Sequence, residues 1–263
     1  MILAIYTLSA RELTRFFRQR NRVIGALAQP IIFWLLFGAG LRGSFNRDAV
    51  GGLSYMEYFV PGVAAMILLF TAIFSTISII EDRREGFLQS VLVAPVSRAG
   101  LVLGKLFGGT LLAVLQGALF VGLAVLTQDG LTLNLFNVAA LLGAMALVAF
   151  ALVGLGFCIA WRSQSTQGFH AIMSVFLFPM WLLSGAFFPA AGVPMWLEWT
   201  IKLNPLTYGV ALLRHALYLD AGKAAAEGVP AALLALGVSL GFAALMFALA
   251  CASAGKRVQG DLL

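Results

Sequence analysis

The chain has 263 residues, of which 61% are hydrophobic and only 11% are charged. Soluble domains carry roughly 25% charged residues, so this composition excludes an ordinary soluble protein and indicates an integral membrane protein of one domain. The formal net charge of +6 does not indicate a nucleic-acid binder, because most basic residues flank apolar segments. Cys158 and Cys251 each lie in an apolar run, which favours buried thiols over a metal or redox site.

Residues 2–22 have the pattern of an amphipathic helix. At 100° per residue, four basic residues fall within one narrow sector, namely Arg11, Arg15, Arg18 and Arg22. Apolar side chains cluster on the opposite side, and a helix with two such faces is typical of one lying in the membrane interface. Packing against protein rather than lipid is the alternative. A secretory signal peptide is disfavoured, because the next apolar run is long enough to span a membrane.

Six segments are long and apolar enough to cross a bilayer, which takes about 20 residues. They are residues 23–41, 58–80, 101–127, 135–161, 169–188 and 230–253. An even number of spans places both termini on one side. Of the 17 basic residues, 12 fall on that side, so the positive-inside rule predicts that both termini and the loop after the second span are cytoplasmic.

Residues 189–229, between the fifth and sixth spans, are apolar but broken at Asn204-Pro205. We expect two short re-entrant helices dipping into the outer leaflet, with their broken backbone covered by protein. Trp196, Trp199 and Tyr208 would then lie at headgroup depth, where amphipathic rings are favoured. A partly ordered outer loop is the alternative.

The loop between the second and third spans opens with five consecutive charged residues, from Glu81 to Glu85. Phe87, Leu88, Val91 and Leu92 then fall on one stripe of a helix, and Pro95 ends that helix because its ring cannot follow the preceding turn. A short helix within residues 82–96, apolar on one side and charged at its start, suits docking against a soluble partner. An ordinary cytoplasmic loop is the alternative.

The sequence carries little catalytic chemistry. It has no GxxxxGK[ST] loop for ATP, because Gly104-Lys105 is followed by Leu106. His170 and His215 fall on opposite sides of the membrane in this topology, so we predict neither a catalytic site nor a metal site. No acidic residue is expected deep within a span, which weighs against coupling to protons or sodium. Energy must come from elsewhere, or the protein is passive; an intramembrane enzyme is disfavoured.

Aromatic residues are frequent in the first, second and fifth predicted spans. Packing or lipid contact is the default role, and a conduit for an amphipathic or sugar-bearing substrate is the sharper hypothesis. The residues assigned to this conduit are Phe33, Trp34, Phe37, Phe70, Phe74, Phe176 and Trp181.

Three motifs occur in the order found in one family of membrane proteins. They are the run from Glu81 to Arg98 with Gly104-Lys105, the sequence from Ser184 to Pro189, and the sequence from Asn204 to Arg214. Together with the amphipathic N-terminal segment and six spans, these motifs resemble the ABC-2 type permeases, the membrane subunits of ATP-binding-cassette exporters. The family often has an acidic residue at the position of Gln89 or Ser90, so the detailed contacts with an ATPase differ.

The resemblance implies a function for several segments. Residues 82–96 correspond to a coupling helix that docks on a separate ATP-binding subunit, through Arg83, Arg84, Glu85, Gly86, Phe87, Leu88, Val91, Leu92 and Pro95. Residues 2–22 correspond to the interface helix. Two permease copies, presumed identical, would enclose the pathway in a bacterial inner membrane, and ATP and magnesium would bind only to the partner. The substrate would be a drug, a lipid or a glycan. A passive channel or a lipid-organising membrane protein remains the alternative function.

Overall fold

The computed structural model describes residues 2–18, 20–40, 54–93, 97–128, 134–188, 193–218 and 228–255. Within these ranges the regular structure is entirely helical, as predicted. The helices are α1 (Ile2–Arg18), α2 (Arg20–Gly40), α3 (Tyr55–Ser75), α4 (Ile77–Arg84), α5 (Phe87–Val93), α6 (Arg98–Thr127), α7 (Leu135–Arg162), α8 (Thr166–Trp181), a π-helical turn (Leu182–Ala186), α9 (Met195–Leu203), α10 (Pro205–Leu217) and α11 (Ala232–Gly255).

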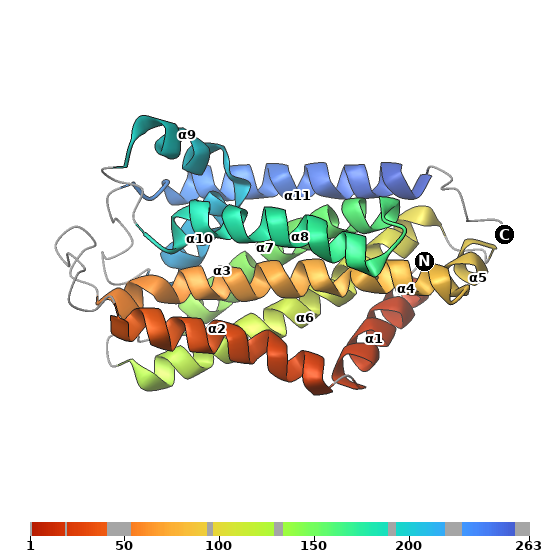
Figure 1. Cartoon of the computed structure of the whole chain (residues 1–263), viewed down its shortest axis with the longest axis horizontal. Helices are drawn as coiled ribbons and strands as arrows, with labels where there is room; N and C mark the ends of the chain where they lie inside the picture. Colours follow the sequence, from red (N-terminus) through yellow and green to blue (C-terminus); the bar gives the residue numbers. More distant parts are fainter. Residues whose placement is uncertain are drawn as a thin grey trace.

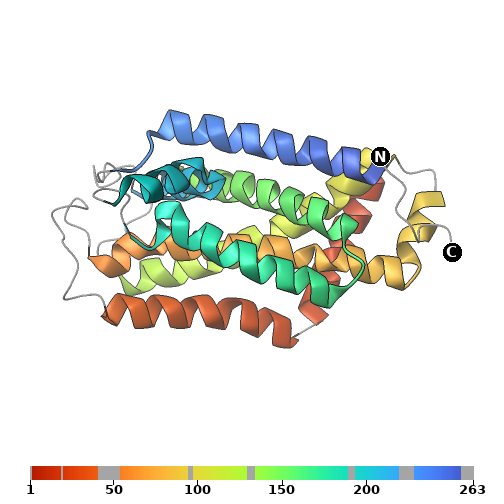
Figure 2. The same ribbon diagram turned by 45° about the horizontal axis from the view of Figure 1, so that its top comes forward.

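The long helices run side by side along one axis (Figures 1 and 2). Five helical segments are long and apolar enough to cross a membrane: Tyr55–Arg84, Arg98–Thr127, Leu135–Arg162, Thr166–Ala186 and Ala232–Gly255. The apolar part of α2 that qualifies, Ala28–Gly40, is shorter than a span. The structure therefore gives a helical membrane protein with five candidate spans, and the first predicted span, residues 23–41, stays a prediction.

The central member of the bundle is the pair α3 and α4. Ser54 and Glu57 form a capping box at its start, which satisfies two orphan N–H groups. At Thr76 the two helices join with only a short turn, where the Thr76 N–H bonds to the carbonyl of Ile73 at 3.0 Å. Of the apolar window in Tyr55–Arg84, 83% is buried, against 22% for α11. The α3–α4 pair is therefore the core of the fold rather than a peripheral span.

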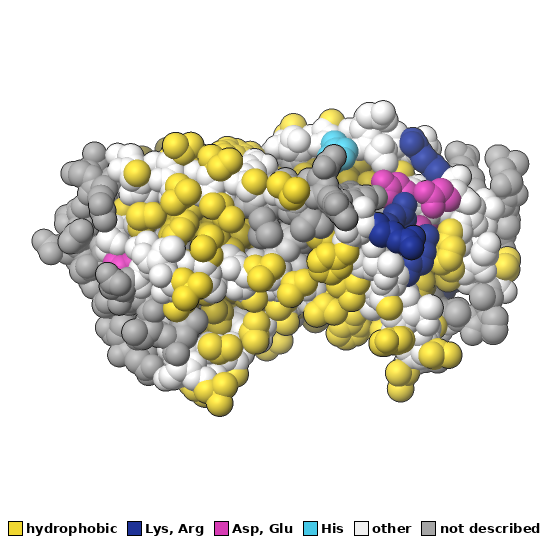
Figure 3. All heavy atoms as spheres, turned by 90° about the horizontal axis from the view of Figure 1, so that it is seen from below, with side chains coloured by type: hydrophobic (Ala, Val, Ile, Leu, Met, Phe, Trp, Pro, Cys, Tyr) yellow, Lys and Arg dark blue, Asp and Glu magenta, His cyan; other side chains and the backbone are white. Residues whose placement is uncertain are grey.

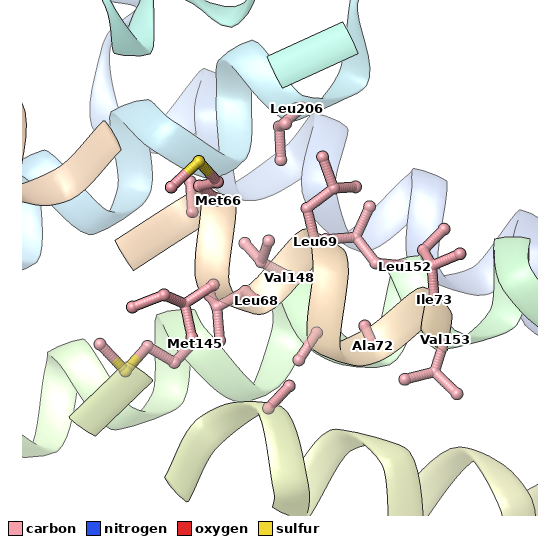
Figure 4. Close-up of a cluster of buried hydrophobic side chains, with 14 of the residues drawn as sticks. Met66, Leu68, Leu69, Ala72, Ile73, Met145, Val148, Leu152, Val153 and Leu206 are labelled. Atoms are coloured by element: carbon pink, nitrogen blue, oxygen red, sulfur yellow. The ribbon is translucent and has the colours of Figure 1, made fainter. Parts of the chain in front are cut away.

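The core lies where α3 meets α6, α7 and α10. Figure 4 shows its side chains interdigitating between these helices. The labelled residues are Met66, Leu68, Leu69, Ala72, Ile73, Met145, Val148, Leu152, Val153 and Leu206, and all ten are buried. In a bilayer, such packing stabilises helix association through close contact rather than through removal of apolar surface from water.

Helix α1 does not continue into α2 but turns to lie across α6 (Figure 1). Two glycines of α6 make this close approach possible. A Cβ on Gly104 would lie 2.8 Å from Leu8 Cβ, and a Cβ on Gly108 would lie 2.9 Å from Glu12 Cβ. Ser9 Oγ also donates a hydrogen bond to the Gly104 carbonyl at 2.9 Å. Small residues at such a spacing let two helix backbones approach, and α1 is seated in the resulting notch.

The opposite end of the bundle carries α9 and the start of α10 (Figure 1). Asn204 sits between these helices, and its side-chain amide donates to the carbonyls of Met180 and Leu183 at 2.6 and 2.9 Å. It thereby satisfies carbonyls freed where α8 gives way to the π-helical turn. Trp196 is 70% exposed on α9, an apolar surface facing outward. How deeply these helices enter a bilayer stays a prediction.

Candidate functional site

The candidate site is built around the α4–α5–α6 junction, which comprises α4, α5 and the first two turns of α6. Gly86 separates α4 from α5 with a φ of +75°, in the left-handed region that glycine adopts without strain. Its N–H bonds to the Arg83 carbonyl at 3.3 Å, which closes the end of α4. Because of this turn, α5 leaves the axis of the bundle and projects at its end (Figure 1).

Helix α5 has one side fixed to the protein and one side free. Leu88 is buried in the main core, and Phe87 and Val91 pack partly against it. The Arg11 guanidinium lies 3.7 Å from the centre of the Phe87 ring, a cation–π contact. Val93, by contrast, is 85% exposed. Part of the predicted apolar stripe therefore anchors α5 to its own chain; the Leu92 side chain and Pro95 lie outside the described residues.

A network of charged side chains ties the junction to α1, and Asp82 of α4 is its centre. Asp82 is fully buried. Its carboxylate accepts from Arg11 at 2.8 Å, from Arg15 at 3.0 Å and from Lys105 of α6 at 2.5 Å. Lys105 also bonds to Glu12 at 2.5 Å. Figure 3 shows the exposed part of this network as adjoining patches of basic and acidic side chains at one end of the molecule.

The predicted basic face of the N-terminal helix is thus divided. Arg15 also pairs with Glu81 at 2.8 Å and with Glu85 at 3.4 Å. Burial lowers the pKa of the Arg11 guanidinium, but the hydrogen bond and charge of Asp82, with weaker help from Glu12 and Glu85, raise this pKa above its ordinary value. Arg11 and Arg15 therefore form ion pairs with α4 and the turn that follows it. These pairs support packing of the basic face of α1 against protein.

The remaining two predicted interface arginines are Arg18 and Arg22. Arg18 is exposed, and the side chain of Arg22 is outside the described residues. Their contact with lipid headgroups stays a prediction.

Two further arginines of the junction hold the ends of other helices. Arg83 donates to the carbonyls of Trp161 and Ser163, at 2.7 and 3.1 Å, at the C-terminus of α7. Arg98 donates to the Ala254 carbonyl, at 2.5 Å, at the C-terminus of α11. Cations at these positions satisfy orphan carbonyls and complement the negative end of the helix dipole. The junction is therefore bonded directly to α1, α7 and α11.

Arg84 and Glu85, which the resemblance places in the coupling set, are exposed. The Arg84 guanidinium donates a hydrogen bond to the Gln164 carbonyl at 3.3 Å. With Ser90 and Val93 of α5, these residues form the part of the junction that a separate protein can reach.

A cavity of about 350 Å³ opens beside the ion-pair network, between α1, α2, α3, α6 and α8. Its apolar lining residues include Phe16, Pro30, Met66, Phe70, Phe74 and Leu112. Its polar lining residues include Glu12, Arg15, Gln29, Thr71, Ser75 and His170. The His170 ring lies 5.4 Å from the Phe74 ring, and His170 is exposed. A cavity of this composition can hold an amphipathic molecule.

The structure separates the seven aromatic residues predicted for the conduit. Phe70 and Phe74 line the cavity, whereas Phe33 and Phe37 line a shallow hollow on α2. Phe176 is exposed on α8. Trp34 and Trp181 are buried, and their indole N–H groups donate to the carbonyls of Met56 and Gly62 at 3.2 and 2.8 Å. These two tryptophans therefore pack the bundle, and a common aromatic conduit stays a prediction.

The residues that sequence reasoning missed are Glu12, Asp82, Lys105, Gly104 and Gly108. Two signals could have found them. One is the Gly-x-x-x-Gly spacing on α6, which predicts a helix contact. The other is a lysine two turns inside an apolar helix, which demands a buried counter-charge. Across the described ranges, no group of three or more His, Cys, Asp or Glu side chains could hold a metal ion.

The family model for the ABC-2 type transporter matches residues 4–218. Nodulation protein J of Rhizobium leguminosarum bv. trifolii is 28% identical over 194 residues, covering 73% of this chain and 72% of that protein. The putative transport permease ycf38 of Cyanophora paradoxa is 25% identical over 217 residues, covering 80% of this chain and 72% of that protein. The daunorubicin resistance ABC transporter permease protein DrrB1 of Streptomyces coeruleorubidus is 22% identical over 208 residues, covering 76% of this chain and 70% of that protein.

Proposed function

Since this chain belongs to the ABC-2 type transporter family and is a membrane permease subunit of an ABC exporter, we propose that a separate ATP-binding subunit drives it by docking on α5. The observation that carries this proposal is the division of α5 into an anchored side and a free side. Leu88 fixes the helix to the core, while Val93 is 85% exposed beyond the bundle. A partner that moves α5 must therefore move the helices bonded to it.

In this proposal ATP and magnesium bind to the partner subunit and not to this chain. The sequence contains no GxxxxGK[ST] loop, the device by which many ATPases cradle phosphates. ATP binding would close the partner subunits, displace α5, and shift the helices of the junction as rigid elements.

The substrate pathway lies between two copies of the chain, with the cavity beside α1 and α8 as its entrance. Helix α8 presents an apolar face that the single chain leaves uncovered, with Ile172, Val175 and Phe176 exposed. Apolar residues of α2 are exposed on the same chain, among them Ile32, Leu35 and Leu36. A second copy and lipid would cover these faces. The relatives named for nodulation and for daunorubicin resistance make an amphipathic export substrate the natural class.

We further propose that the end of the bundle carrying α5 faces the cytoplasm. The starts of α1 and α6 and the end of α11 gather at this end (Figure 2). Among the basic residues whose side chains the structure describes, most belong to helices or turns at this end. Both chain termini would then be cytoplasmic in a bacterial inner membrane, as the positive-inside rule predicts.

The docking proposal is tested by co-purification. The chain would be expressed with an ATP-binding subunit from a neighbouring gene, extracted in detergent and assayed for bound ATPase. Ser90→Arg, on the exposed side of α5, should remove the ATPase. Thr200→Arg is the matched control, because Thr200 is an exposed hydroxyl residue on α9 at the other end. Equal retention of the ATPase by both variants would reject docking on α5.

The alternative of a passive channel or lipid-organising protein is separated by reconstitution. Vesicles containing the chain alone should release none of three probes, namely daunorubicin, a fluorescent phospholipid and a lipid-linked oligosaccharide. Vesicles that also contain the ATPase should move at least one probe when ATP is supplied. Release without nucleotide at the same rate would favour the passive channel.

A further inference from the structure

Lys105 is a buried lysine in an otherwise apolar part of α6. Only 4% of the residue is exposed, and its ammonium donates to Glu12 and Asp82 and also to the Ser78 hydroxyl at 3.1 Å. Its three partners thus come from α1 and α4. A lone ammonium in this environment would be very costly, so its geometry is set by these partners.

The position of Lys105 along α6 matters as much as its charge. It lies between Gly104 and Gly108, the two glycines that let α1 approach α6. The notch therefore brings α1 within reach, and the lysine fixes α1 along the helix axis by bonding to Glu12. Small residues alone do little to fix the register of a helix in such a notch. The Lys105–Glu12 bond is the charged contact that fixes it, beside the neutral hydrogen bond from Ser9 to the Gly104 carbonyl.

Asp82 extends the same connection to α5. It is the third residue from the end of α4 and lies four residues before Gly86. Lys105 shares its carboxylate with Arg11 and Arg15, and Arg11 also covers Phe87 of α5. One carboxylate is thus held by cations from α1 and α6 at the point where α5 begins.

A buried ion pair is weak evidence for stability, because apolar residues of similar volume are often equally stabilising. In some proteins, buried polar groups instead fix the register of the helices that they join. The network around Lys105 fits that role, because it fixes three elements relative to one another at the site where we place the force from the ATPase.

We propose that Lys105 is the positioning residue that makes α1, the α4–α5 segment and α6 move as one body when the partner displaces α5. This inference rests on the proposed function. It assigns to Lys105 no contact with substrate or nucleotide. A merely structural role would change the amount of folded protein, whereas this role changes the relative motion of the helices.

The decisive variant is Lys105→Met combined with Glu12→Gln. It removes both charges of the buried pair and leaves Asp82 with its two arginines, so no uncompensated charge stays buried. Lys105→Met alone would leave the buried Glu12 carboxylate without the lysine that compensates its charge, and an uncompensated buried charge destabilises the fold. The matched control is Lys202→Met with Glu198→Gln, which removes the exposed ion pair of α9, whose atoms lie 2.6 Å apart.

The measurement is the distance between spin labels in the complex with its ATPase, before and after trapping with ATP and vanadate. Cys158→Ala and Cys251→Ala clear the background. One pair of labels, at Thr7 and Leu111, spans α1 and α6. A reference pair, at Leu3 and Leu142, spans α7 and α1, which stays bonded to α4 through Asp82 and leaves the docking face of α5 unlabelled. All four positions are exposed.

In the parent and in the control, trapping should move the reference pair and leave the Thr7–Leu111 distance unchanged. In Lys105→Met/Glu12→Gln, the Thr7–Leu111 distance should shift by about 2–5 Å, the size of helix displacements in switching proteins. An unchanged distance in that variant, with the reference pair still moving, would overturn the inference alone. A motionless reference pair in the parent would overturn the proposed function and the inference with it.

Discussion

The seating of α1 on α6 makes a sharp prediction for Gly108→Ala. The new Cβ would lie 2.9 Å from Glu12 Cβ and 3.2 Å from the Ser9 Cα. Ordinary carbon contacts are about 3.5–4.0 Å. Because the Ser9 Cα is backbone, no side-chain rotation can relieve both contacts, and α1 must move away by roughly 0.6 Å or more to reach that range.

Two opposing effects set the size of the change. Overpacking a close contact costs about 1–3 kcal/mol, while replacing glycine by alanine within a helix gains up to about 1 kcal/mol. Gly122→Ala is the matched control on the same helix, because no atom lies within 4 Å of its added Cβ. Gly122→Ala should therefore show only the stabilisation that alanine brings to a helix. We therefore expect Gly108→Ala to be less stable than Gly122→Ala by about 1–3 kcal/mol.

The assay is thermal unfolding in detergent at one scan rate, because membrane proteins unfold irreversibly and only matched scans compare. For a chain of this size, about 1 kcal/mol shifts the midpoint by roughly 2–4 °C. Gly108→Ala should therefore melt several degrees below Gly122→Ala. If the midpoints of the two variants are equal, and equal to or higher than that of the parent, then α1 does not pack against Gly104 and Gly108 of α6.

Three further substitutions test other contacts. Gly86→Val should lose about 1–2 kcal/mol by forcing a branched residue to positive φ, whereas Gly86→Asn should lose less; thermal midpoints compare them. Arg83→Met should cost about 1.5–3 kcal/mol through charge-assisted bonds to the end of α7, while exposed Arg84→Met should stay within about 0.5 kcal/mol, measured in the same way. Asn204→Ala leaves the Met180 carbonyl unpaired at about 1–3 kcal/mol, and should speed proteolysis at the end of α8.

Each of these tests has an outcome that counts against it. Equal midpoints for the valine and asparagine variants would show that the turn before α5 does not need a left-handed residue. Equal losses for the two arginine variants would mean that α7 is not held by the junction. Unchanged proteolysis of the asparagine variant would place the bond to α8 elsewhere.

Local pattern was enough to predict α5. Its apolar stripe lies on one helical face, which is a signal from neighbours in sequence. The predicted range of 82–96 began too early, because residues 82–84 belong to α4 and the turn at Gly86 separates the two helices. The run of charges from Glu81 to Glu85 misled the prediction in one respect. It reads as a solvated loop, yet Asp82 is fully buried, because two of its partners lie about 70 residues earlier on α1 and a third lies on α6. No local pattern shows such a pairing.

The aromatic residues show the same limit. Trp34 and Trp181 have the residue type expected for a conduit, but both are buried and bonded to backbone carbonyls. A tryptophan that fills a core and one that lines a pathway have the same sequence signal in an apolar helix. Only the neighbouring helices decide between them, which is why Phe70 and Phe74 face the cavity and these two do not.

The near-continuous run of α3 and α4 has a mechanical consequence. Thirty residues of helix measure about 45 Å, which is long enough to reach from one face of a bilayer to the other. At one tip, the Tyr55 and Tyr58 hydroxyls donate hydrogen bonds to the carbonyls of Phe187 and Gly185, each at 3.1 Å. Asp82 lies near the other tip. Under the proposed docking on α5, a displacement applied at the Asp82 tip would reach the tyrosine tip along a helix interrupted only by the turn at Thr76.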